Sequence, residues 1–192
     1  MEYDEASALL VLDVQNDFAD PTGNLYVRGG EETIEFINQQ IAEASRRGAM
    51  VVYTQDWHPE TTPHFEKDGG IWPVHCVAET EGAAFHPELE VIDSAVFVRK
   101  GVGGEDGYSG FSLRDPVTGE KSSTGLVGEL AMIESVALVG LALDYCVKET
   151  ALDAVRRFQT TLLADGTRPV NLRPGDGTRA VAEMVSAGVA VE

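Results

Sequence analysis

The sequence is poor in cysteine, in basic residues and in long apolar runs. Only two of its 192 residues are cysteines, Cys76 and Cys146, which argues against a disulfide framework and fits a reduced, intracellular setting. The 14 basic residues are outnumbered by 32 acidic ones, and the net charge of −18 disfavours nucleic acid and anionic membranes as partners. No apolar run reaches the roughly 18 residues that a membrane helix requires, and the acidic start of the chain does not resemble a signal peptide. We therefore expect a cytoplasmic protein that binds neither nucleic acid nor a membrane.

The remaining composition is that of an ordinary globular domain. Hydrophobic residues make up 43% of the chain and charged residues 24%, as in many globular proteins. The length suffices for one sizeable core but is short for two. Since the sequence contains no internal repeat, low-complexity tract or linker, we expect a single domain that spans residues 1–192.

Short apolar segments alternate with amphipathic segments along the chain. The apolar segments predict six strands, at residues 8–12, 50–54, 94–98, 136–139, 160–164 and 189–191. The helical spacing of other apolar residues predicts helices at 31–47, 126–133, 144–158 and 176–187, with Gly48 and Gly188 ending the first and the last of them. This alternation indicates an α/β fold: a three-layer sandwich with a central, mostly parallel six-stranded sheet and helices on both faces.

Three chemically active side chains lie just beyond predicted strands, namely Asp13, Lys100 and Cys146. The carboxyl ends of parallel strands form one edge of a sheet, where open α/β proteins bind ligands, so these side chains can converge. A thiol with a pKa of about 8.5 is mostly protonated at neutral pH, so a nucleophilic cysteine needs a base or a nearby cation. Asp13 could take the proton, and Lys100 could stabilise the charged forms. The alternative is that all three residues are caps or buried packing residues.

The turn before Cys146 joins the predicted strand at 136–139 to the next helix. Gly140 ends the apolar run, and Asp144 is a candidate N-cap whose carboxylate would accept hydrogen bonds from backbone N–H groups of the helix. The start of a helix carries unpaired N–H donors and positive partial charge, which favour a thiolate and an oxyanion. The N–H groups of Ala142 and Cys146 are therefore a candidate oxyanion hole. A structural cysteine is the alternative, because free cysteine is often buried.

A segment between the second and third predicted strands, residues 55–76, holds three of the four histidines and both tryptophans. It has neither a helical nor a strand period, and its aromatic content argues against disorder. Asp56, His58 and His75 have the ligand types of a site with two histidines and one carboxylate, which zinc, iron and manganese all accept. His64 lies in the same segment and is a further candidate ligand.

Two other features have structural interpretations. Gly101, Gly103 and Gly104 follow Lys100, and because no G-x-x-x-x-G-K-[ST] motif is present, a phosphate-binding loop is excluded. His86, which stands between a phenylalanine and a proline, is interpreted as a surface or turn residue. Neither feature enters the predicted site.

Six short motifs occur in an order that is typical of one enzyme family. They are DVQNDF at 13–18, DWH at 56–58, WPVHCV at 72–77, RKG at 99–101, YSGF at 108–111 and GLALDYCV at 140–147. With these motifs the sequence resembles the nicotinamidases (pyrazinamidases) of the isochorismatase-like cysteine hydrolase superfamily. The resemblance runs from about Leu9 to Asp165, and six motifs in register make it specific.

The resemblance implies a catalytic triad made of Asp13, Lys100 and Cys146. It also implies that the backbone N–H groups of Ala142 and Cys146 form the oxyanion hole, with a cis peptide bond before Ala142. One position departs from the family pattern: Leu143 stands where a small polar residue, often threonine, is common. This departure leaves the backbone donors in place but removes any side-chain hydrogen bond at that position.

The resemblance also implies a metal site and a ring pocket. Asp56, His58 and His75 would hold one divalent ion, which would be zinc, iron or manganese, with His64 as an additional ligand. The pocket for the pyridine ring of the substrate would be lined by Phe18, Trp72 and Tyr108.

The implied reaction is hydrolysis of nicotinamide to nicotinic acid and ammonia through a thioester on Cys146, as a step of NAD salvage. Pyrazinamide, a close ring analogue, is expected to be cleaved as well. The expected partner is thus a small aromatic amide, and the sequence is compatible with a homo-oligomer. Two alternatives are another hydrolase of the superfamily, acting on a different amide or on isochorismate, and a non-catalytic binding protein with the same fold. The metal-ligand residues argue against an isochorismatase, and the presence of nucleophile, base and lysine together argues against a non-catalytic protein.

Overall fold

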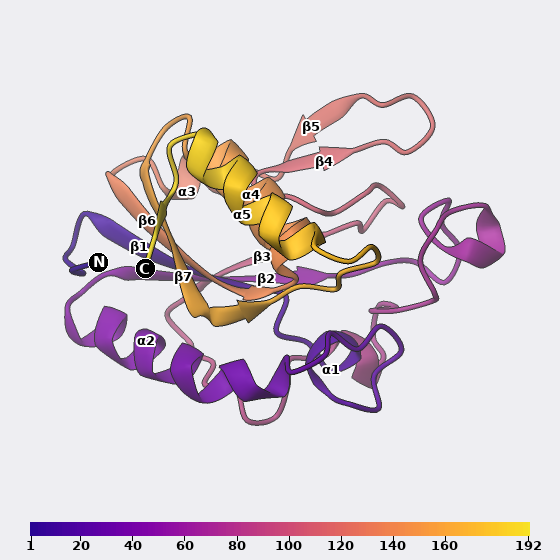
Figure 1. The fold of residues 1–192 in the computed structure, drawn as a ribbon, viewed down its shortest axis with the longest axis horizontal. Helices are drawn as coiled ribbons and strands as arrows, with labels where there is room; N and C mark the ends of the chain where they lie inside the picture. The colour runs from indigo at the N-terminus through magenta and orange to yellow at the C-terminus, as the bar shows by residue number, and fades with distance from the viewer.

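The computed structural model describes residues 1–192 and is built around a sheet of six strands, all of them parallel (Figure 1). In chain order they are β1 (Ser7–Leu12), β2 (Met50–Asp56), β3 (Val96–Lys100), β6 (Ser135–Leu141), β7 (Gln159–Arg168) and β8 (Ala190–Val191). Their spatial order is β3-β2-β1-β6-β7-β8. The first strand, β1, is therefore central; β2 and β3 follow on one side of it, and β6, β7 and β8 follow on the other. The predicted α/β fold with a six-stranded parallel sheet is confirmed.

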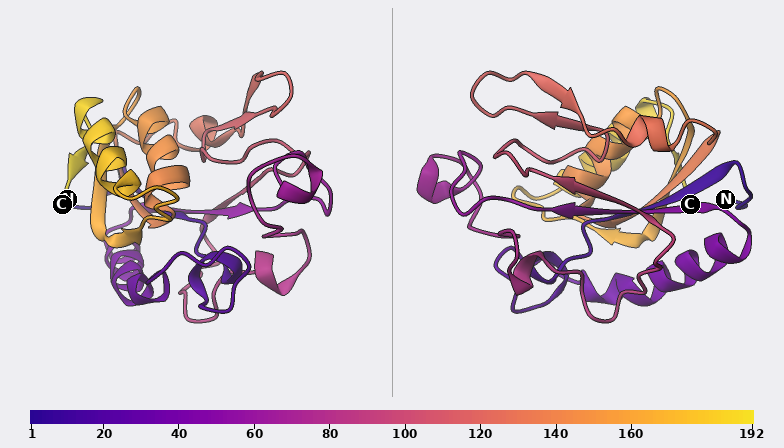
Figure 2. Two further views of the ribbon diagram at one scale, coloured as in Figure 1. Left: turned by 45° about the vertical axis from the view of Figure 1, so that its right-hand side comes forward. Right: turned by 180° about the vertical axis from the view of Figure 1, so that it is seen from behind.

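Helices cover both faces of this sheet (Figures 1 and 2). Helix α2 (Ile34–Arg46) lies on one face, and α3 (Leu126–Glu129), α4 (Lys148–Ala154) and α5 (Asp176–Ser186) lie on the other. A π-helical turn, η4 (Leu143–Val147), joins β6 to α4. The remaining short helices are α1 (Asn16–Ala19) and the 3₁₀ turns η1 (Glu31–Thr33), η2 (Glu66–Asp68) and η3 (Glu81–Ala83).

Strand β1 illustrates why the apolar runs become central strands. Its side chains alternate between the two cores: Leu9 and Val11 pack on the side of α2, whereas Ala8, Leu10 and Leu12 pack on the side of α3, α4 and α5. No residue of β1 is exposed to solvent. A parallel strand that is covered on both faces needs apolar residues at nearly every position, which explains the continuous run in the sequence.

Four strands extend past the carboxyl ends of the apolar runs that predicted them. Strands β2 and β3 each continue by two residues, to Asp56 and Lys100. Strand β6 continues through Gly140 to Leu141; Gly140 has a φ of 111°, and a Cβ there would lie 2.0 Å from the carbonyl oxygen of Leu12. Only glycine fits this close approach of two strands. Strand β7 runs to Arg168, past the predicted end at Ala164, with a register shift against β6. The added residues are not uniformly apolar, so periodicity does not reveal them.

A two-stranded antiparallel hairpin, β4 (Ser112–Arg114) with β5 (Lys121–Ser123), was not predicted. It projects from the body of the protein at the upper right of Figure 1. All three residues of β5 are exposed, so no buried face imposes an alternating pattern on this sequence. The backbone of Arg114 exchanges two hydrogen bonds with that of Asp106, which anchors the hairpin to the preceding loop.

The interpretation of His86 as a surface residue is wrong. Its side chain lies next to a turn, as expected, but the residue is buried. The backbone N–H of His86 donates to the carbonyl of Val14, and its Nδ1 accepts a hydrogen bond from the backbone N–H of Glu88. Contacts with a segment far away in the sequence therefore bury this histidine.

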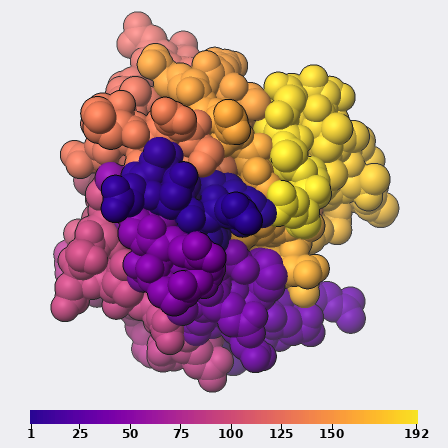
Figure 3. All heavy atoms as spheres, turned by 90° about the vertical axis from the view of Figure 1, so that its left-hand side faces the viewer, coloured from indigo at the N-terminus to yellow at the C-terminus, as the bar shows by residue number.

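The two ends of the sheet are covered differently. The long loops and the hairpin gather at the carboxyl ends of the strands, as both views of Figure 2 show. At the opposite end, which faces the viewer in Figure 3, the N-terminal residues lie in the centre with the C-terminal part of the chain beside them. None of the helices has the length and apolar character required to cross a membrane.

Candidate active site

Cys146 lies in the π-helical turn η4, just beyond the carboxyl end of β6. Strands β1 and β6 are neighbours at which the direction of sheet growth reverses, and such switch points are where open α/β sheets bind ligands. The Leu141–Ala142 peptide bond is cis, and the backbone N–H of Ala142 donates no hydrogen bond within the protein. The predicted helical turn around Cys146 is therefore present, with a wider, π-type geometry.

Asp144 is not the N-cap that the sequence predicted. The extended residue before the turn is Ala142, and Asp144 lies inside the turn, where no side chain caps the helix. Its carboxylate instead accepts hydrogen bonds from the backbone N–H groups of Val170 and Asn171, each at 2.8 Å. Asp144 thus fastens the segment after β7 to the turn that carries Cys146.

Lys100 is the centre of a buried polar cluster. Its Nζ lies 2.7 Å from Asp13 Oδ2, 2.6 Å from Asp56 Oδ1 and 3.7 Å from Cys146 Sγ, and it also donates to the carbonyl oxygen of Gly107. Asp13 directly follows β1, whereas Asp56 and Lys100 are the last residues of β2 and β3. The edge of the sheet therefore brings together the three side chains that the sequence singled out. We call Asp13, Asp56, Lys100 and Cys146 the lysine cluster.

Asp13 is held on both of its carboxylate oxygens. Lys100 binds Oδ2, and the hydroxyl of Thr54 donates to Oδ1 at 2.5 Å. The backbone of Asp13 has a φ of 50°, in the left-handed region that few residues other than glycine adopt. Such conformations persist where the surroundings fix them, and they concentrate at functional sites.

Burial and charge move the pKa values in the lysine cluster apart. Burial raises the pKa of Asp13, and the neighbouring Asp56 raises it further against the opposing effect of Lys100. Burial also opposes ionisation of Asp56, but Lys100 and His58 hold its pKa well below its usual range. Burial raises the pKa of the Cys146 thiol, and although burial lowers that of Lys100, the two carboxylates keep its pKa high. The resting cluster therefore contains a neutral thiol beside an ammonium group.

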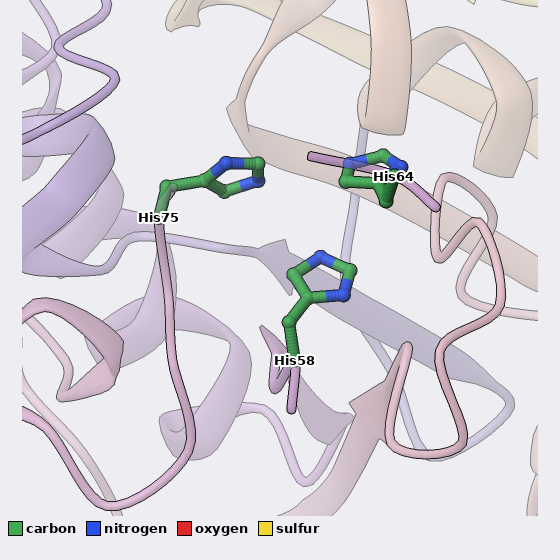
Figure 4. Close-up of side chains that lie close together, drawn as sticks. All are labelled: His58, His64 and His75. Carbon is green, nitrogen blue, oxygen red and sulfur yellow. The ribbon is translucent and has the colours of Figure 1, made fainter. Parts of the chain in front are cut away.

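Three histidines converge next to the lysine cluster (Figure 4). One ring nitrogen from each of His58, His64 and His75 lies within 4.8 Å of the others. Nδ1 of His64 lies 2.8 Å from a carboxylate oxygen of Asp106, and Nδ1 of His75 lies 2.7 Å from the carbonyl oxygen of Pro73. Both ring nitrogens of His58 are buried without a hydrogen-bond partner. We call His58, His64 and His75 the histidine cluster.

The histidine cluster has the chemistry of a divalent-metal site. A buried polar group without a partner costs about 1–3 kcal/mol, which an ion bound to His58 would relieve. Metal-binding histidines usually have their second ring nitrogen hydrogen-bonded to a carboxylate or a carbonyl, as His64 and His75 have. Burial lowers the pKa of His75 to about 4, so its imidazole is neutral at pH 7 and able to bind a cation. The residues present therefore fit a divalent ion, and zinc, iron and manganese accept imidazole.

The predicted ligands Asp56, His58 and His75 lie together, but Asp56 has a second role. Its Oδ2 is 3.8 Å from His58 Nε2, while its Oδ1 binds Lys100. His64, which the sequence offered only as an additional ligand, supplies the third nitrogen of the histidine cluster. Asp56 therefore connects the histidine cluster with the lysine cluster.

A mainly apolar cavity lies between the two clusters. Its lining includes the three residues that the resemblance assigned to a ring pocket, Phe18, Trp72 and Tyr108, together with Cys146. The indole N–H of Trp72 donates to the hydroxyl of Tyr108 at 2.8 Å, and Tyr145 meets Trp72 edge-on at 4.7 Å between ring centroids. The sequence did not predict four lining residues: Leu25, Val27, Tyr145 and Val170. The cavity thus combines aromatic and aliphatic walls with a thiol.

The sequence also did not predict three supporting residues. The side chain of Gln15 donates to the carbonyl of Asp56 and accepts from its N–H, both at 2.8 Å. Thr54 binds Asp13, and Asp106 binds His64. Gln15 lies within the first of the six motifs, so that motif is a usable signal. Thr54 and Asp106 carry no such signal, because only the tertiary structure brings them to their partners.

Known proteins resemble this chain over nearly its whole length. Residues 7–191 match the Isochorismatase domain family. The chain is 36% identical over 200 residues to a nicotinamidase of Escherichia coli (strain K12), covering 94% of this chain and 92% of that relative. It is 39% identical over 171 residues to a nicotinamidase/pyrazinamidase of Mycobacterium tuberculosis, covering 85% of this chain and 87% of that relative.

Solved structures of two similar proteins share the fold. One, from L. infantum, is a complex with nicotinate and has a TM-score of 0.91 at 35% identity, covering 100% of this chain and 95% of that one. The other, a pyrazinamidase of Pyrococcus horikoshii in complex with zinc, has a TM-score of 0.85 at 35% identity, covering 97% of this chain and 98% of that one. The similarity therefore includes the sheet and the segments that carry both clusters.

Proposed function

Because the chain belongs to the Isochorismatase domain family, we propose that it is a nicotinamidase, which hydrolyses nicotinamide to nicotinic acid and ammonia. One observation carries this proposal: the thiol of Cys146, next to a buried aspartate and a buried lysine, opens into an aromatic cavity beside three convergent histidines. The apolar walls suit a flat pyridine ring, and the thiol suits attack on an amide carbon.

Asp13 acts as the general base and Cys146 as the nucleophile. The pKa of Asp13 is raised, so its carboxylate is a stronger base than that of an exposed aspartate. It takes the proton from Sγ as the sulfur attacks the amide carbon, and the ammonium group of Lys100, 3.7 Å away, stabilises the developing thiolate. When the tetrahedral adduct collapses, the C–N bond breaks, Asp13 returns the proton to the leaving ammonia, and a thioester remains.

The backbone N–H groups of Ala142 and Cys146 hold the oxyanion of that adduct. The N–H of Ala142 has no acceptor within the protein and is available to a ligand. Each donor of this kind contributes about 3 kcal/mol to transition-state stabilisation. Leu143 is buried in the core on the side of α4, so its side chain supports the turn through packing rather than through a hydrogen bond.

Hydrolysis of the thioester completes the reaction. Asp13, ionised again, takes a proton from a water molecule that attacks the thioester carbon. The C–S bond breaks, Cys146 leaves as a thiolate next to Lys100, and the proton on Asp13 restores the thiol. The product is nicotinic acid, and the cluster returns to its starting protonation state.

Asp56, His58, His64 and His75 would hold one divalent ion, which would be zinc, iron or manganese. Such an ion would act as a Lewis acid toward the pyridine nitrogen and would orient the ring. Phe18, Trp72 and Tyr108 pack against the ring and exclude water from it. With the ring nitrogen at the histidines, the carboxamide would point toward Cys146, which lines the same cavity.

An assay of ammonia release from nicotinamide tests this function, with Cys146→Ser as the inactive variant. We expect Cys146→Ser to lower kcat by at least about 10³-fold, because removal of a nucleophile removes most of the catalytic acceleration. Cys76→Ala, which changes the other cysteine, is the matched control and should retain turnover. Pyrazinamide should be cleaved as well. A folded, metal-loaded wild-type protein that releases no ammonia from either amide would refute the function and favour another amide as substrate.

The cellular role that follows is salvage of NAD precursors in the cytoplasm. The site binds a small aromatic amide. The chain has 32 acidic and 14 basic residues, and this excess of negative charge makes nucleic acid and anionic membranes poor partners. A single catalytic domain covers the whole chain, and assembly into a homo-oligomer is compatible with this role.

A further inference from the structure

Asp106 makes a contact that the proposed reaction does not use. We propose that Asp106 is a positioning residue that fixes the tautomer and orientation of His64 and thereby makes it a metal ligand. This inference rests on the metal site of the proposed function and adds the residue that completes it. Asp106 is not among the residues that line the cavity beside Cys146, so it acts on the site through the ring of His64 and through its own charge.

The contact between Asp106 and His64 determines which ring nitrogen can bind a cation. Asp106 Oδ1 lies 2.8 Å from His64 Nδ1, and the two side chains are 14% and 4% exposed. A neutral imidazole has one N–H donor and one lone pair, and a carboxylate accepts only from the donor. The hydrogen is therefore on Nδ1, and the lone pair is on Nε2, which leaves Nε2 as the nitrogen for a cation. The ring of His64 turns toward those of His58 and His75, as Figure 4 shows.

His64 differs from the other two histidines in the partner of its ring. His75 is held by a neutral carbonyl, that of Pro73, and His58 has no hydrogen-bond partner on either nitrogen. His64 alone among the three is hydrogen-bonded to a carboxylate, which makes the imidazole a stronger ligand and fixes its orientation. Asp106 also adds a negative charge near the place where a dication would bind.

The backbone around Asp106 is held by contacts that do not involve its carboxylate. Its N–H and carbonyl exchange hydrogen bonds with Arg114 at 2.7 and 3.2 Å. The neighbouring carbonyl of Gly104 accepts from the hydroxyl of Thr62, which in turn accepts from the N–H of His64. Both loops therefore remain joined when only the side chain of Asp106 is changed. A substitution at this position tests the contact with the ring rather than the fold.

The hairpin formed by β4 and β5 supports the position of Asp106. Strand β4 pairs with Asp106 through Arg114 and so supports the residue that holds His64. The next residue along the loop, Gly107, supplies the carbonyl that accepts from Lys100. One short loop thus supports both the histidine cluster and the lysine cluster.

The test compares three variants: Asp106→Ala, Asp106→Asn and Glu105→Gln. Glu105→Gln removes one negative charge from the same loop without touching His64, so it is the matched control for charge. Zinc and cobalt(II) affinities are measured on metal-free protein by competition with a chelator, and the cobalt(II) absorption spectrum reports the ligand set. We expect Asp106→Ala to weaken zinc binding by about 10–100-fold. Asp106→Asn, whose amide oxygen can still accept from Nδ1, should recover part of this loss, and Glu105→Gln should bind like the wild type.

The thermal unfolding of the metal-free variants separates positioning from a structural role. We expect metal-free Asp106→Ala and wild type to unfold at similar temperatures. Unchanged zinc affinity in a folded Asp106→Ala protein, or equal losses in Asp106→Ala and Glu105→Gln, would overturn the inference, as would a wild type that binds no ion. A wild type that binds zinc but releases no ammonia would refute the proposed function and leave the inference standing.

A second measurement does not depend on the alanine variant. Long-range ¹H–¹⁵N spectra of the metal-free protein, in mildly alkaline buffer where imidazoles are neutral, report the tautomer of each histidine. We expect His64, assigned with a His64→Gln variant, to carry its hydrogen on Nδ1. Asp106→Asn should shift it to a mixture of tautomers, because an amide can either accept or donate. A wild-type His64 with its hydrogen on Nε2 would contradict the inference.

Discussion

The lysine cluster and the histidine cluster lie side by side and are joined by Asp56, yet they are built differently. The lysine cluster stands on the ends of sheet strands, and its ammonium group is compensated by two carboxylates of this chain. The histidine cluster is carried by the segment between β2 and β3, and the ring of His58 has no hydrogen-bond partner. The charges of the first cluster are therefore compensated within the chain, whereas the second has the ligand types of a site for an external cation.

This difference suits the two clusters to different functions, the lysine cluster to the chemical step and the histidine cluster to binding. Strand ends in a covered sheet are fixed by the core, so a nucleophile, base and cation held there keep their geometry before any substrate binds. Loop-borne histidines with an unsatisfied ring acquire a fixed geometry when an ion binds, because binding relieves the cost of the unpaired nitrogens. We accordingly expect changes to the lysine cluster to affect folding and chemistry together, and changes to the histidine cluster to affect metal and substrate binding.

The largest effect is expected from Lys100→Met. This change leaves the carboxylates of Asp13 and Asp56 buried without their cation, which costs about 3–5 kcal/mol of folding free energy. It also removes the charge that stabilises the thiolate, so turnover should be lost even where the protein remains folded. Denaturant unfolding and ammonia release measure the two effects. His58→Ala is the comparison in the other cluster: equal destabilisation of both metal-free variants would break the distinction between the clusters.

Metal removal is the corresponding experiment on the histidine cluster. Chelation should lower the free energy of unfolding by about 2.7 kcal/mol relative to protein at a free-ion concentration one hundred times the Kd. It should also raise KM for nicotinamide, because the ring nitrogen loses its partner. Thermal unfolding and elemental analysis before and after reconstitution with zinc, iron or manganese measure this. If chelated protein binds nicotinamide with unchanged KM, the ion has no role in holding the ring.

Asp13 should make activity and stability respond to pH with opposite signs. The reaction needs an ionised Asp13, whose pKa is raised, so kcat/KM should fall by about tenfold for each pH unit below that pKa. Between the unfolded and the raised folded pKa, the folded state holds the proton more tightly, so this residue's contribution to stability grows as the pH falls.

Asp56 does not obscure this effect. Its folded pKa lies well below its unfolded value, so it stabilises the fold above the unfolded pKa, and that contribution is lost only as the pH falls below it toward the folded pKa. Profiles of kcat/KM and of denaturant unfolding over the same pH range give the measurement, with metal content determined at each pH. If the fall of kcat/KM at low pH follows the loss of the ion instead, the histidine cluster and not Asp13 causes that fall.

The smallest effect is expected from Leu143→Thr, which tests whether the turn needs a polar side chain. Leu143 is 9% exposed and packs in the core with residues of α3 and α4. Its replacement leaves a cavity and a hydroxyl without an assured partner, so the melting temperature should fall. We expect kcat at saturating nicotinamide to rise by less than about tenfold, equivalent to about 1.4 kcal/mol. A larger gain would show that a polar side chain acts in the transition state.

Several features of the site follow from the sequence because they depend on position along a strand. Asp13 and Lys100 end apolar runs, and Cys146 begins the helix after another run, so the parallel sheet alone brings them together. The histidines could be grouped because they lie in one segment. In contrast, local rules predict that Asp144 caps the helix, whereas its actual partners, Val170 and Asn171, lie far along the chain.

The sheet and the reactive side chains at its edge can be predicted from the local pattern of the sequence. Apolar runs can only be buried as covered strands, and parallel strands present their carboxyl ends at one edge. Which groups pair at this edge depends on the tertiary fold: Thr54 and Lys100 share Asp13, Asp56 lies between the two clusters, and Asp106 is hydrogen-bonded to His64. The physical reason is range. Burial patterns repeat locally and are written into adjacent residues, whereas a hydrogen bond between distant segments depends on where folding places both of its partners.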